Sequence, residues 1–166
     1  MIKTVFLDRD GTLCDLVNGI RGPRTLSELI IRTENIQACK KLKEGGFLLI
    51  GITNQPDIAR GKLLWSDLCE INNTIQRLCG IQEFFVCPHD DYDNCNCRRP
   101  LPGLINLAVK KYNIDLQKSY FIGDTWRDRI ASEKIGIPNR NIIIIGNEYT
   151  FDDAYTYILW KEGGNK

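Results

Sequence analysis

The sequence predicts an α/β fold built on a doubly wound, mainly parallel sheet. Short apolar stretches alternate with segments of helical periodicity, and these stretches are apolar throughout, as parallel strands covered on both faces are. No internal repeat or low-complexity segment interrupts the alternation. A chain of 166 residues with 43% hydrophobic residues is long enough for one well-buried core, so we expect a single domain over 1–166.

The chain opens with a strand over 4–7, whose side chains are β-branched or large and apolar. Gly11 then turns the chain, and 13–30 carries Asn-Gly and Gly-Pro turn signals without a sustained period, which predicts a loop or small flap. Apolar side chains at helical spacing, with lysines outward and two glycines at the end, predict a helix over 34–44. The next stretch, 47–53, is apolar throughout and is expected to be the second strand.

The second half of the chain repeats this alternation. Ser66 is the expected N-cap of the first helix there, because its hydroxyl can accept from a free backbone N–H group of the first turn. Strands and helices that follow one another in this way favour a Rossmann-like sheet with helices on both faces. The remaining strands are expected at 84–86, 120–123 and 141–145, and the remaining helices at 67–78, at 102–112 and from a cap at Asp152 through Trp160.

Composition narrows the class of partner. Lysine and arginine number 22 against 21 aspartates and glutamates, so no overall basic field favours nucleic acid. No apolar run approaches the length of a membrane span, and Met1 leads almost directly into the first strand, without room for a targeting segment. We expect a cytoplasmic monomer that binds a small molecule, with no nucleic-acid or membrane partner.

Polar side chains follow the expected strands at the points where these strands end. In an open α/β sheet the carboxyl ends of the strands line a ligand crevice, so these groups are expected to meet there. Two neighbouring carboxylates repel each other unless a cation or a proton lies between them, and sites rich in oxygen suit Mg²⁺. For the first pair alone, a strand followed by an Asx-type turn is an equally good interpretation. The groups are Asp8 and Asp10, Thr53 and Asn54, Arg98 and Arg99, and Asp124 and Asp128.

Over residues 4–136 these groups resemble the haloacid-dehalogenase superfamily of phosphotransferases. Its marks are D-x-D-G-T, a Thr or Ser after the second strand, a basic residue, and G-D-x-x-x-D, and all four occur here in that order. The resemblance implies that Asp8 attacks phosphorus and forms an aspartyl-phosphate, while Asp10 protonates the leaving group and then activates water. It also implies that Thr53 donates a hydrogen bond to the phosphoryl group.

The same resemblance implies a Mg²⁺ site. Its ligands would be the Asp8 carboxylate, the Asp10 backbone carbonyl and Asp124. Asp128 is expected to orient these ligands or to balance the charge of the site without binding the ion itself. The alternative for Asp128 is an acid at a helix N-terminus, where the helix dipole favours a negative charge.

A second signal lies in the loop 87–97, which contains the one histidine of the chain. Two pairs of potential ligands, separated by five residues, give a Cys₃His set that suits tetrahedral structural Zn²⁺ and leaves no open position for catalysis. Unliganded thiols are the alternative. Seven cysteines without a secretory segment do not indicate a disulfide framework, and the other four lie in apolar patterns as core residues. The expected zinc ligands are Cys87, His89, Cys95 and Cys97, and the expected core residues are Cys14, Cys39, Cys69 and Cys79.

A narrower resemblance comes from the stretch 53–62, the zinc-ligand pairs and the stretch 98–103. They are similar to the branch of the superfamily that contains heptose 1,7-bisphosphate phosphatases and histidinol-phosphate phosphatase domains, which are small enzymes without a separate cap domain. The resemblance implies that Arg99 takes the place of a catalytic lysine; arginine keeps the charge but differs in reach. The zinc loop is also shorter than is usual in this branch. The substrate contacts that the resemblance implies are Asn54, Gln55, Arg60 and Arg98.

The substrate stays open between two classes, and two further functions compete with them. A second phosphate of a sugar bisphosphate would suit a group of arginines, whereas the amine of histidinol phosphate would call for acidic partners. A DNA or RNA 3′-phosphatase shares the first motif but needs a basic groove, and an inactive scaffold would keep only the fold. The arginines are Arg21, Arg24, Arg60 and Arg98, and the acidic residues are Asp90, Asp91 and Asp93.

Overall fold

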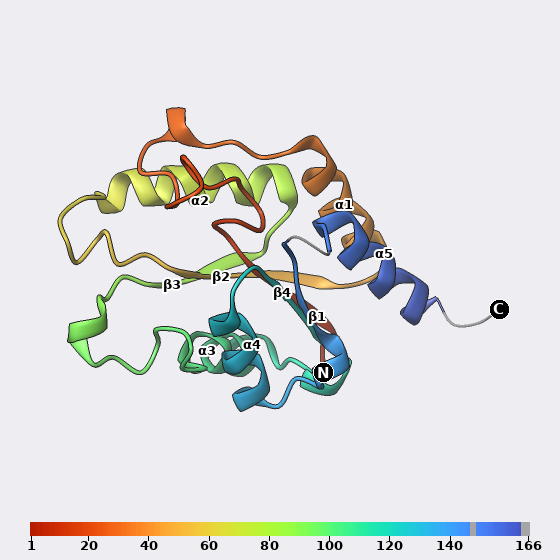
Figure 1. Ribbon diagram of the computed structural model, residues 1–166. Helices are drawn as coiled ribbons and strands as arrows, with labels where there is room; N and C mark the ends of the chain where they lie inside the picture. Colours follow the sequence, from red (N-terminus) through yellow and green to blue (C-terminus); the bar gives the residue numbers. More distant parts are fainter. Residues whose placement is uncertain (147–148, 164–166) are drawn as a thin grey trace.

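The computed structural model describes residues 1–146 and 149–163 (Figure 1). Its centre is a sheet of five parallel strands in the order β3-β2-β1-β4-β5. The chain forms β1, adds β2 and β3 on one side, and returns to the other side for β4 and β5. This reversal makes the sheet doubly wound, confirms the predicted fold class and places a switch point between β1 and β4. The strands are β1 (Thr4–Asp8), β2 (Leu48–Asn54), β3 (Glu83–Cys87), β4 (Tyr120–Gly123) and β5 (Ile142–Ile144).

Helices cover both faces of this sheet. Helices α1, α2 and α5 lie on one face, and α3 and α4 lie on the other (Figure 1). Val5 and Leu7 of β1 join the core under the first group, and Phe6 joins the core under the second, so the strand is apolar throughout. The helices are α1 (Thr33–Glu44), α2 (Trp65–Cys79), α3 (Gly103–Tyr112), α4 (Trp126–Ile135) and α5 (Phe151–Glu162), with short 3₁₀ turns at Leu26–Glu28, Asp91–Asp93, Leu116–Lys118 and Asn139–Asn141.

The predicted cap of α2 is wrong. Leu64, not Ser66, is the N-cap residue, with extended backbone angles (φ −80°, ψ 149°) and no side-chain capping bond. Ser66 is already inside the first turn of the helix. The side chains of Leu63 and Leu68 on either side of this turn are buried, so packing rather than a hydroxyl cap accounts for where the helix starts.

The predicted cap of α5 is also wrong, by two residues. Thr150 is the N-cap, and its hydroxyl accepts from the Asp153 backbone N–H at 3.2 Å. The Asp153 carboxylate accepts in return from the Thr150 backbone N–H at 2.8 Å. This reciprocal capping box satisfies two free donors at once, whereas Asp152 lies within the helix, where the dipole favours its charge.

Two further features differ from expectation. Helix α4 is absent from the elements that periodicity predicts, because half of its ten residues are charged and no continuous apolar stripe marks it. Cys69 is exposed rather than a core residue, since it lies beside the buried face of α2 that Leu68 and Ile71 form. No helix of the described residues is both long and apolar enough to span a bilayer. The single domain over 1–166 stays a prediction.

Candidate active site

The carboxyl ends of β1, β2 and β4 bring the predicted polar groups to one edge of the sheet. Asp8 is the last residue of β1, and Asp10 follows in a tight turn whose N–H groups at Leu13 and Cys14 both donate to the Arg9 carbonyl. Gly11 has φ +86°, and a Cβ at this position would overlap the Asp124 carboxylate. The turn can therefore approach β4 this closely only with glycine.

Asp8, Asp124 and Asp128 form a carboxylate cluster in which one oxygen of each lies within 4.8 Å of the others. Burial raises the pKa of Asp8, and the Asp10 charge adds to this although Arg99 opposes it. Burial and the neighbouring Asp8 raise the pKa of Asp124 to about 7. Burial is the largest cause of both shifts.

Arg99 is the positive group that the sequence predicted beside these carboxylates. Its guanidinium is buried, donates through Nη2 to Asp8 Oδ1 at 2.6 Å, and donates through Nη1 to Asp128 Oδ1. Its Nε is buried and has no acceptor among residues 1–146 and 149–163. The pair of contacts fixes the guanidinium directly beside Asp8.

Asp128 combines the two positions proposed for it from the sequence. It lies in the first turn of α4, where its Oδ2 accepts from the backbone N–H and the hydroxyl of Thr125 at 3.0 and 2.8 Å. Its Oδ1 accepts from Arg99. Because these donors use both oxygens, the open carboxylates of the cluster are Asp8 and Asp124, and these two fit a hard divalent cation that would relieve their repulsion.

Asp10 is held by donors from two directions. Gln55 Nε2 donates to Asp10 Oδ2 at 2.7 Å and to the Thr53 hydroxyl at 2.8 Å, so it links the two residues predicted to act on the phosphoryl group. Arg9, which the sequence analysis did not single out, donates from Nε and Nη2 to the two Asp10 oxygens at 2.8 and 3.1 Å. Its burial has no local signal in the sequence, since it lies between two acidic residues.

The side chain of Asn54, a predicted substrate contact, binds the backbone of Arg99. Its side-chain amide donates to the Arg99 carbonyl at 3.3 Å and accepts from the Arg99 N–H at 3.2 Å. Asn54 therefore ties the end of β2 to the segment that carries Arg99.

The four arginines proposed to bind a second phosphate are all in ion pairs. Their partners join three loops into one network: the flap after β1, the loop after β2 and the loop after β3. Asp57 is central to it, because two of the arginines share this carboxylate. The pairs are Arg21–Glu28 (2.7 Å), Arg24–Asp57 (2.7 Å), Arg60–Asp57 (3.6 Å), Arg60–Asp90 (2.5 Å) and Arg98–Asp91 (2.6 Å).

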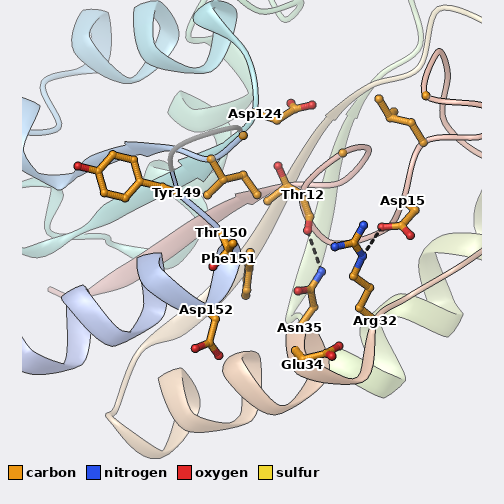
Figure 2. Close-up of a pocket in the computed structure, with 15 residues that line it drawn as sticks. Thr12, Asp15, Arg32, Glu34, Asn35, Asp124, Tyr149, Thr150, Phe151 and Asp152 are labelled. Carbon is orange, nitrogen blue, oxygen red and sulfur yellow. Dashed lines mark hydrogen bonds and ion pairs between the residues drawn. The ribbon is translucent and has the colours of Figure 1, made fainter.

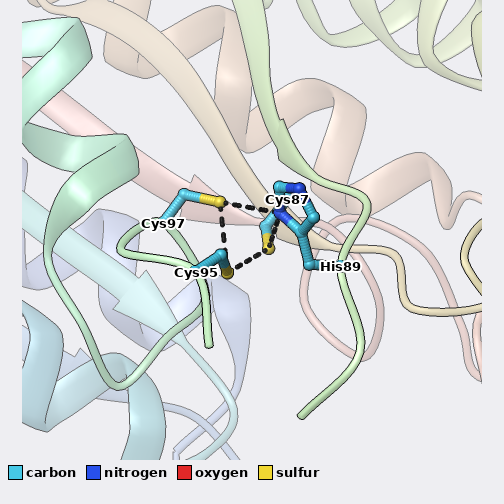
Figure 3. A group of neighbouring side chains, drawn as sticks. All are labelled: Cys87, His89, Cys95 and Cys97. Carbon is cyan, nitrogen blue, oxygen red and sulfur yellow. Dashed lines mark hydrogen bonds between the residues drawn. The ribbon is translucent and has the colours of Figure 1, made fainter. Parts of the chain in front are cut away.

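The predicted zinc ligands lie together at the end of β3 (Figure 3). Cys87 Sγ lies 3.6 Å from His89 Nδ1 and 3.6 Å from Cys95 Sγ, and Cys97 Sγ lies 3.3 Å from His89 Nδ1 and 3.5 Å from Cys95 Sγ. Ligands at ~2.3 Å from a tetrahedral Zn²⁺ would be about 3.8 Å apart, close to these separations. Burial raises the pKa of Cys95, but backbone N–H groups outweigh it and lower this pKa to about 7. The set fits zinc.

A cavity of about 680 Å³ lies beside the turn that follows β1 and contains Gly11 (Figure 2). It lies between this turn, the start of α1 and the start of α5, with Thr12 and Asp124 on its wall. Asn35 donates to the Thr12 carbonyl at 3.0 Å, and Arg32 pairs with Asp15 at 2.9 Å beside it. No motif predicts this cavity, because its walls come from two segments, 11–35 and 124–152, that are far apart in the sequence.

Comparison with known proteins gives a family match and close relatives. The family model described as "Polynucleotide kinase 3 phosphatase" matches residues 3–149. The chain is 34% identical, over 88% of its length and 85% of the relative's, to D-glycero-alpha-D-manno-heptose-1,7-bisphosphate 7-phosphatase of Photorhabdus laumondii. It is 31% identical, over 92% of its length and 87% of the relative's, to D-glycero-beta-D-manno-heptose-1,7-bisphosphate 7-phosphatase of Pasteurella multocida.

Among solved structures, the fold is similar to that of D,D-heptose 1,7-bisphosphate phosphatase from B. bronchiseptica, which was crystallised with magnesium and phosphate. The TM-score is 0.82 with 23% identity, and the match covers 96% of this chain and 99% of the other. At this identity the similarity concerns the fold.

Proposed function

Because the chain belongs to the polynucleotide kinase 3 phosphatase family and is a phosphoric monoester hydrolase, we propose that it removes the 7-phosphate of D-glycero-D-manno-heptose 1,7-bisphosphate through an aspartyl-phosphate. The fold of the family is that of the haloacid-dehalogenase-like phosphatases. The observation that carries the chemistry is the buried Asp8 carboxylate, with Arg99 on one side and Asp124 on another. The names of the relatives support the substrate class.

Asp8 is the nucleophile. Its carboxylate oxygen forms a bond to phosphorus while the bond from phosphorus to the sugar oxygen breaks, and Asp10 gives this oxygen a proton. Asp10 then takes a proton from the water that hydrolyses the aspartyl-phosphate. Thr53 donates to the phosphoryl group, and Arg99 holds Asp8 and opposes the negative charge that the transferred group carries.

Mg²⁺ is the proposed cofactor at Asp8, Asp124 and the Asp10 carbonyl. When bound, it neutralises negative charge on the phosphoryl oxygens. The support from this structure is electrostatic: the buried Asp8 and the half-buried Asp124 both have raised pKa values, and their oxygens lie within 4.8 Å of each other, where a divalent cation would relieve their repulsion. Asp128 acts through Arg99, as its contacts indicate.

Zn²⁺ is the proposed structural ion of the loop 87–97. The four ligands use every tetrahedral position, so the ion would stabilise the loop without taking part in chemistry. The loop also carries the carboxylates that bind Arg60 and Arg98. Zinc would thereby fix two of the arginines proposed to meet the substrate.

The arginine network supports a substrate with two anionic groups. A phosphate that enters this region would replace single carboxylate partners, most of them partly exposed, by a doubly charged acceptor. Asp90 and Asp91 pair with Arg60 and Arg98, so the amine of histidinol phosphate would have to displace these arginines, just as a phosphate would displace the carboxylates. A net charge of +1 offers little for a nucleic-acid backbone.

A panel of substrates tests this proposal. Purified protein with Mg²⁺ is given the α and β anomers of heptose 1,7-bisphosphate, heptose 7-phosphate, histidinol phosphate and a 3′-phosphorylated oligonucleotide. We expect the highest kcat/KM with one bisphosphate anomer. Equal values for the bisphosphate and the monophosphate, or a higher value for histidinol phosphate, would overturn the substrate assignment but leave the phosphatase chemistry intact.

A further inference from the structure

Arg9 is a buried charge that the proposed mechanism does not use. Its side chain is fully buried although it lies between two carboxylic acids at the end of β1. Removal of a guanidinium from water is costly unless its donors are satisfied, so a buried arginine needs specific partners. The partners here lie on two different elements, which distinguishes Arg9 from an arginine that only balances charge.

One side of the guanidinium makes two hydrogen bonds with the Asp10 carboxylate. Nε donates to Oδ1 at 2.8 Å and Nη2 donates to Oδ2 at 3.1 Å, which is the parallel, two-bond arrangement of a fork on a carboxylate. Two bonds fix both the position and the rotation of a planar group, whereas one bond leaves it free to turn. Arg9 therefore determines the direction in which the Asp10 oxygens point.

The other side of the guanidinium is anchored to a helix. Nη1 donates at 2.9 Å to the side-chain oxygen of Asn72, a buried polar residue in the apolar face of α2. This face is otherwise formed by Leu68, Ile71 and Ile75, so Asn72 is an exception to its pattern. Its contact explains the exception, because it connects Arg9 to a rigid element of the fold.

The remaining sides of Asp10 are occupied as well. Gln55 donates to Oδ2 at 2.7 Å, and the Cys14 thiol lies 3.6 Å from Oδ1. A Cβ on Gly22 would lie 2.5 Å from Cγ and from both oxygens, so this glycine covers the flat face of the carboxylate. Of these contacts, only the long one from the Cys14 thiol to Oδ1 is weak. Oδ1 is therefore the Asp10 oxygen that can most easily exchange a contact for a hydrogen bond to a reacting group.

We propose that Arg9 is a positioning residue: anchored to α2 through Asn72, its fork holds Asp10 in the orientation that proton transfer to the leaving-group oxygen requires. This inference rests on the phosphatase function proposed above. It concerns orientation, so a positive charge alone is not sufficient. Lysine keeps the charge but has one nitrogen, which cannot make two parallel bonds to Asp10 and also reach Asn72.

Leaving groups that differ in their need for a proton separate this role from a merely structural one. A sugar alkoxide must be protonated as it leaves, whereas p-nitrophenolate leaves without help. We measure kcat/KM because it reports the steps up to and including the first irreversible one. The substrates are heptose bisphosphate and p-nitrophenyl phosphate, and the proteins are wild type, Arg9→Lys, Asp10→Asn and Arg77→Lys. Arg77 is an exposed arginine of the same helix α2 and serves as the matched control.

Arg9→Lys is expected to lose roughly a hundredfold in kcat/KM for the sugar phosphate, with kcat carrying most of the loss. The loss with p-nitrophenyl phosphate should be at least about tenfold smaller, with the same pattern in Asp10→Asn and none in Arg77→Lys. Equal losses on the two substrates, a loss confined to KM, or no loss would overturn the inference. Wild type that hydrolyses neither ester would instead overturn the proposed function.

A second variant covers the case in which Arg9→Lys does not fold. Asn72→Ala removes the anchor but leaves the pair between Arg9 and Asp10, so it should show the same preference for p-nitrophenyl phosphate to a smaller degree. Thermal unfolding and inhibition by inorganic phosphate are measured for every variant, because a general loss of structure would weaken phosphate binding as well. Asn72→Ala with wild-type rates on both esters would contradict the anchoring.

Discussion

Replacement of Gly22 by alanine is expected to lower activity strongly and stability little. The Gly22 backbone lies outside the left-handed region, so alanine fits the backbone without strain. The new Cβ would lie 2.5 Å from three atoms of the Asp10 carboxylate, and since ordinary contacts begin near 3.4 Å, the carboxylate or the loop must move by about 0.9 Å. A displacement of ~1 Å at a reacting group can cost on the order of a hundredfold in rate.

Gly19 provides the opposite control within the same loop. A Cβ there meets nothing within 4 Å among residues 1–146 and 149–163, but the backbone has φ +69°, so alanine is strained without touching the site. Gly19→Ala should lower the free energy of unfolding by about 1–2 kcal/mol and leave kcat unchanged. Steady-state rates with heptose bisphosphate and thermal unfolding are measured for both variants. Gly22→Ala with a rate within threefold of wild type would show that the flap does not restrain Asp10.

Three further outcomes follow from the site. The pKa of Asp124 is raised to about 7 and that of Asp8 is also raised, so the metal-free protein loses stability as pH rises from the ordinary carboxyl range through the folded-state pKa of Asp124. The increase in Tm on addition of Mg²⁺ should therefore be larger at pH 8 than at pH 5, and Asp124→Asn should reduce this difference. The double variant Cys95→Ser, Cys97→Ser should lose bound zinc and unfold at a lower temperature, while its kcat changes little. Wild type with less than about a tenth of a zinc per chain would rule out this ion. Arg98→Ala should narrow the preference for the bisphosphate over the monophosphate by roughly tenfold, and an unchanged ratio would remove Arg98 from the substrate site.

Much of the fold could be predicted because its strands are buried on both faces. Residues 120–123 are apolar throughout for this reason, and the prediction gave the bounds of β4 without error. Helix α4 was not predicted, because its charged residues serve the site and the surface rather than an apolar stripe. Ser66 and Asp152 look like caps in the sequence, yet packing at Leu63 and a reciprocal capping box at Thr150 start these helices instead.

The positions of site residues were predictable where their side chains follow strand ends. They were unpredictable where a contact depends on a partner that is far away in the sequence. Asp8 and Asp124 meet because β1 and β4 are neighbours in the sheet. Their meeting was expected because both follow strand ends, which line one crevice in an open α/β sheet. The contact between Arg9 and Asn72 joins residues 63 positions apart, and no periodicity marks it. The arginines near the flap were visible as charges, but their carboxylate partners depend on how three loops fold against one another.

The identity of the nucleophile is the central claim, and one variant tests it most directly. Wild type and Asp8→Asn are given heptose 1,7-bisphosphate and Mg²⁺, and phosphate release is measured together with the phosphate content of the acid-quenched protein. The amide cannot form an aspartyl-phosphate, so the account predicts that Asp8→Asn loses nearly all turnover and carries no phosphate after the quench. Wild type should release phosphate and also carry phosphate on the quenched protein. Purified, folded Asp8→Asn with activity within a few-fold of wild type would contradict the account.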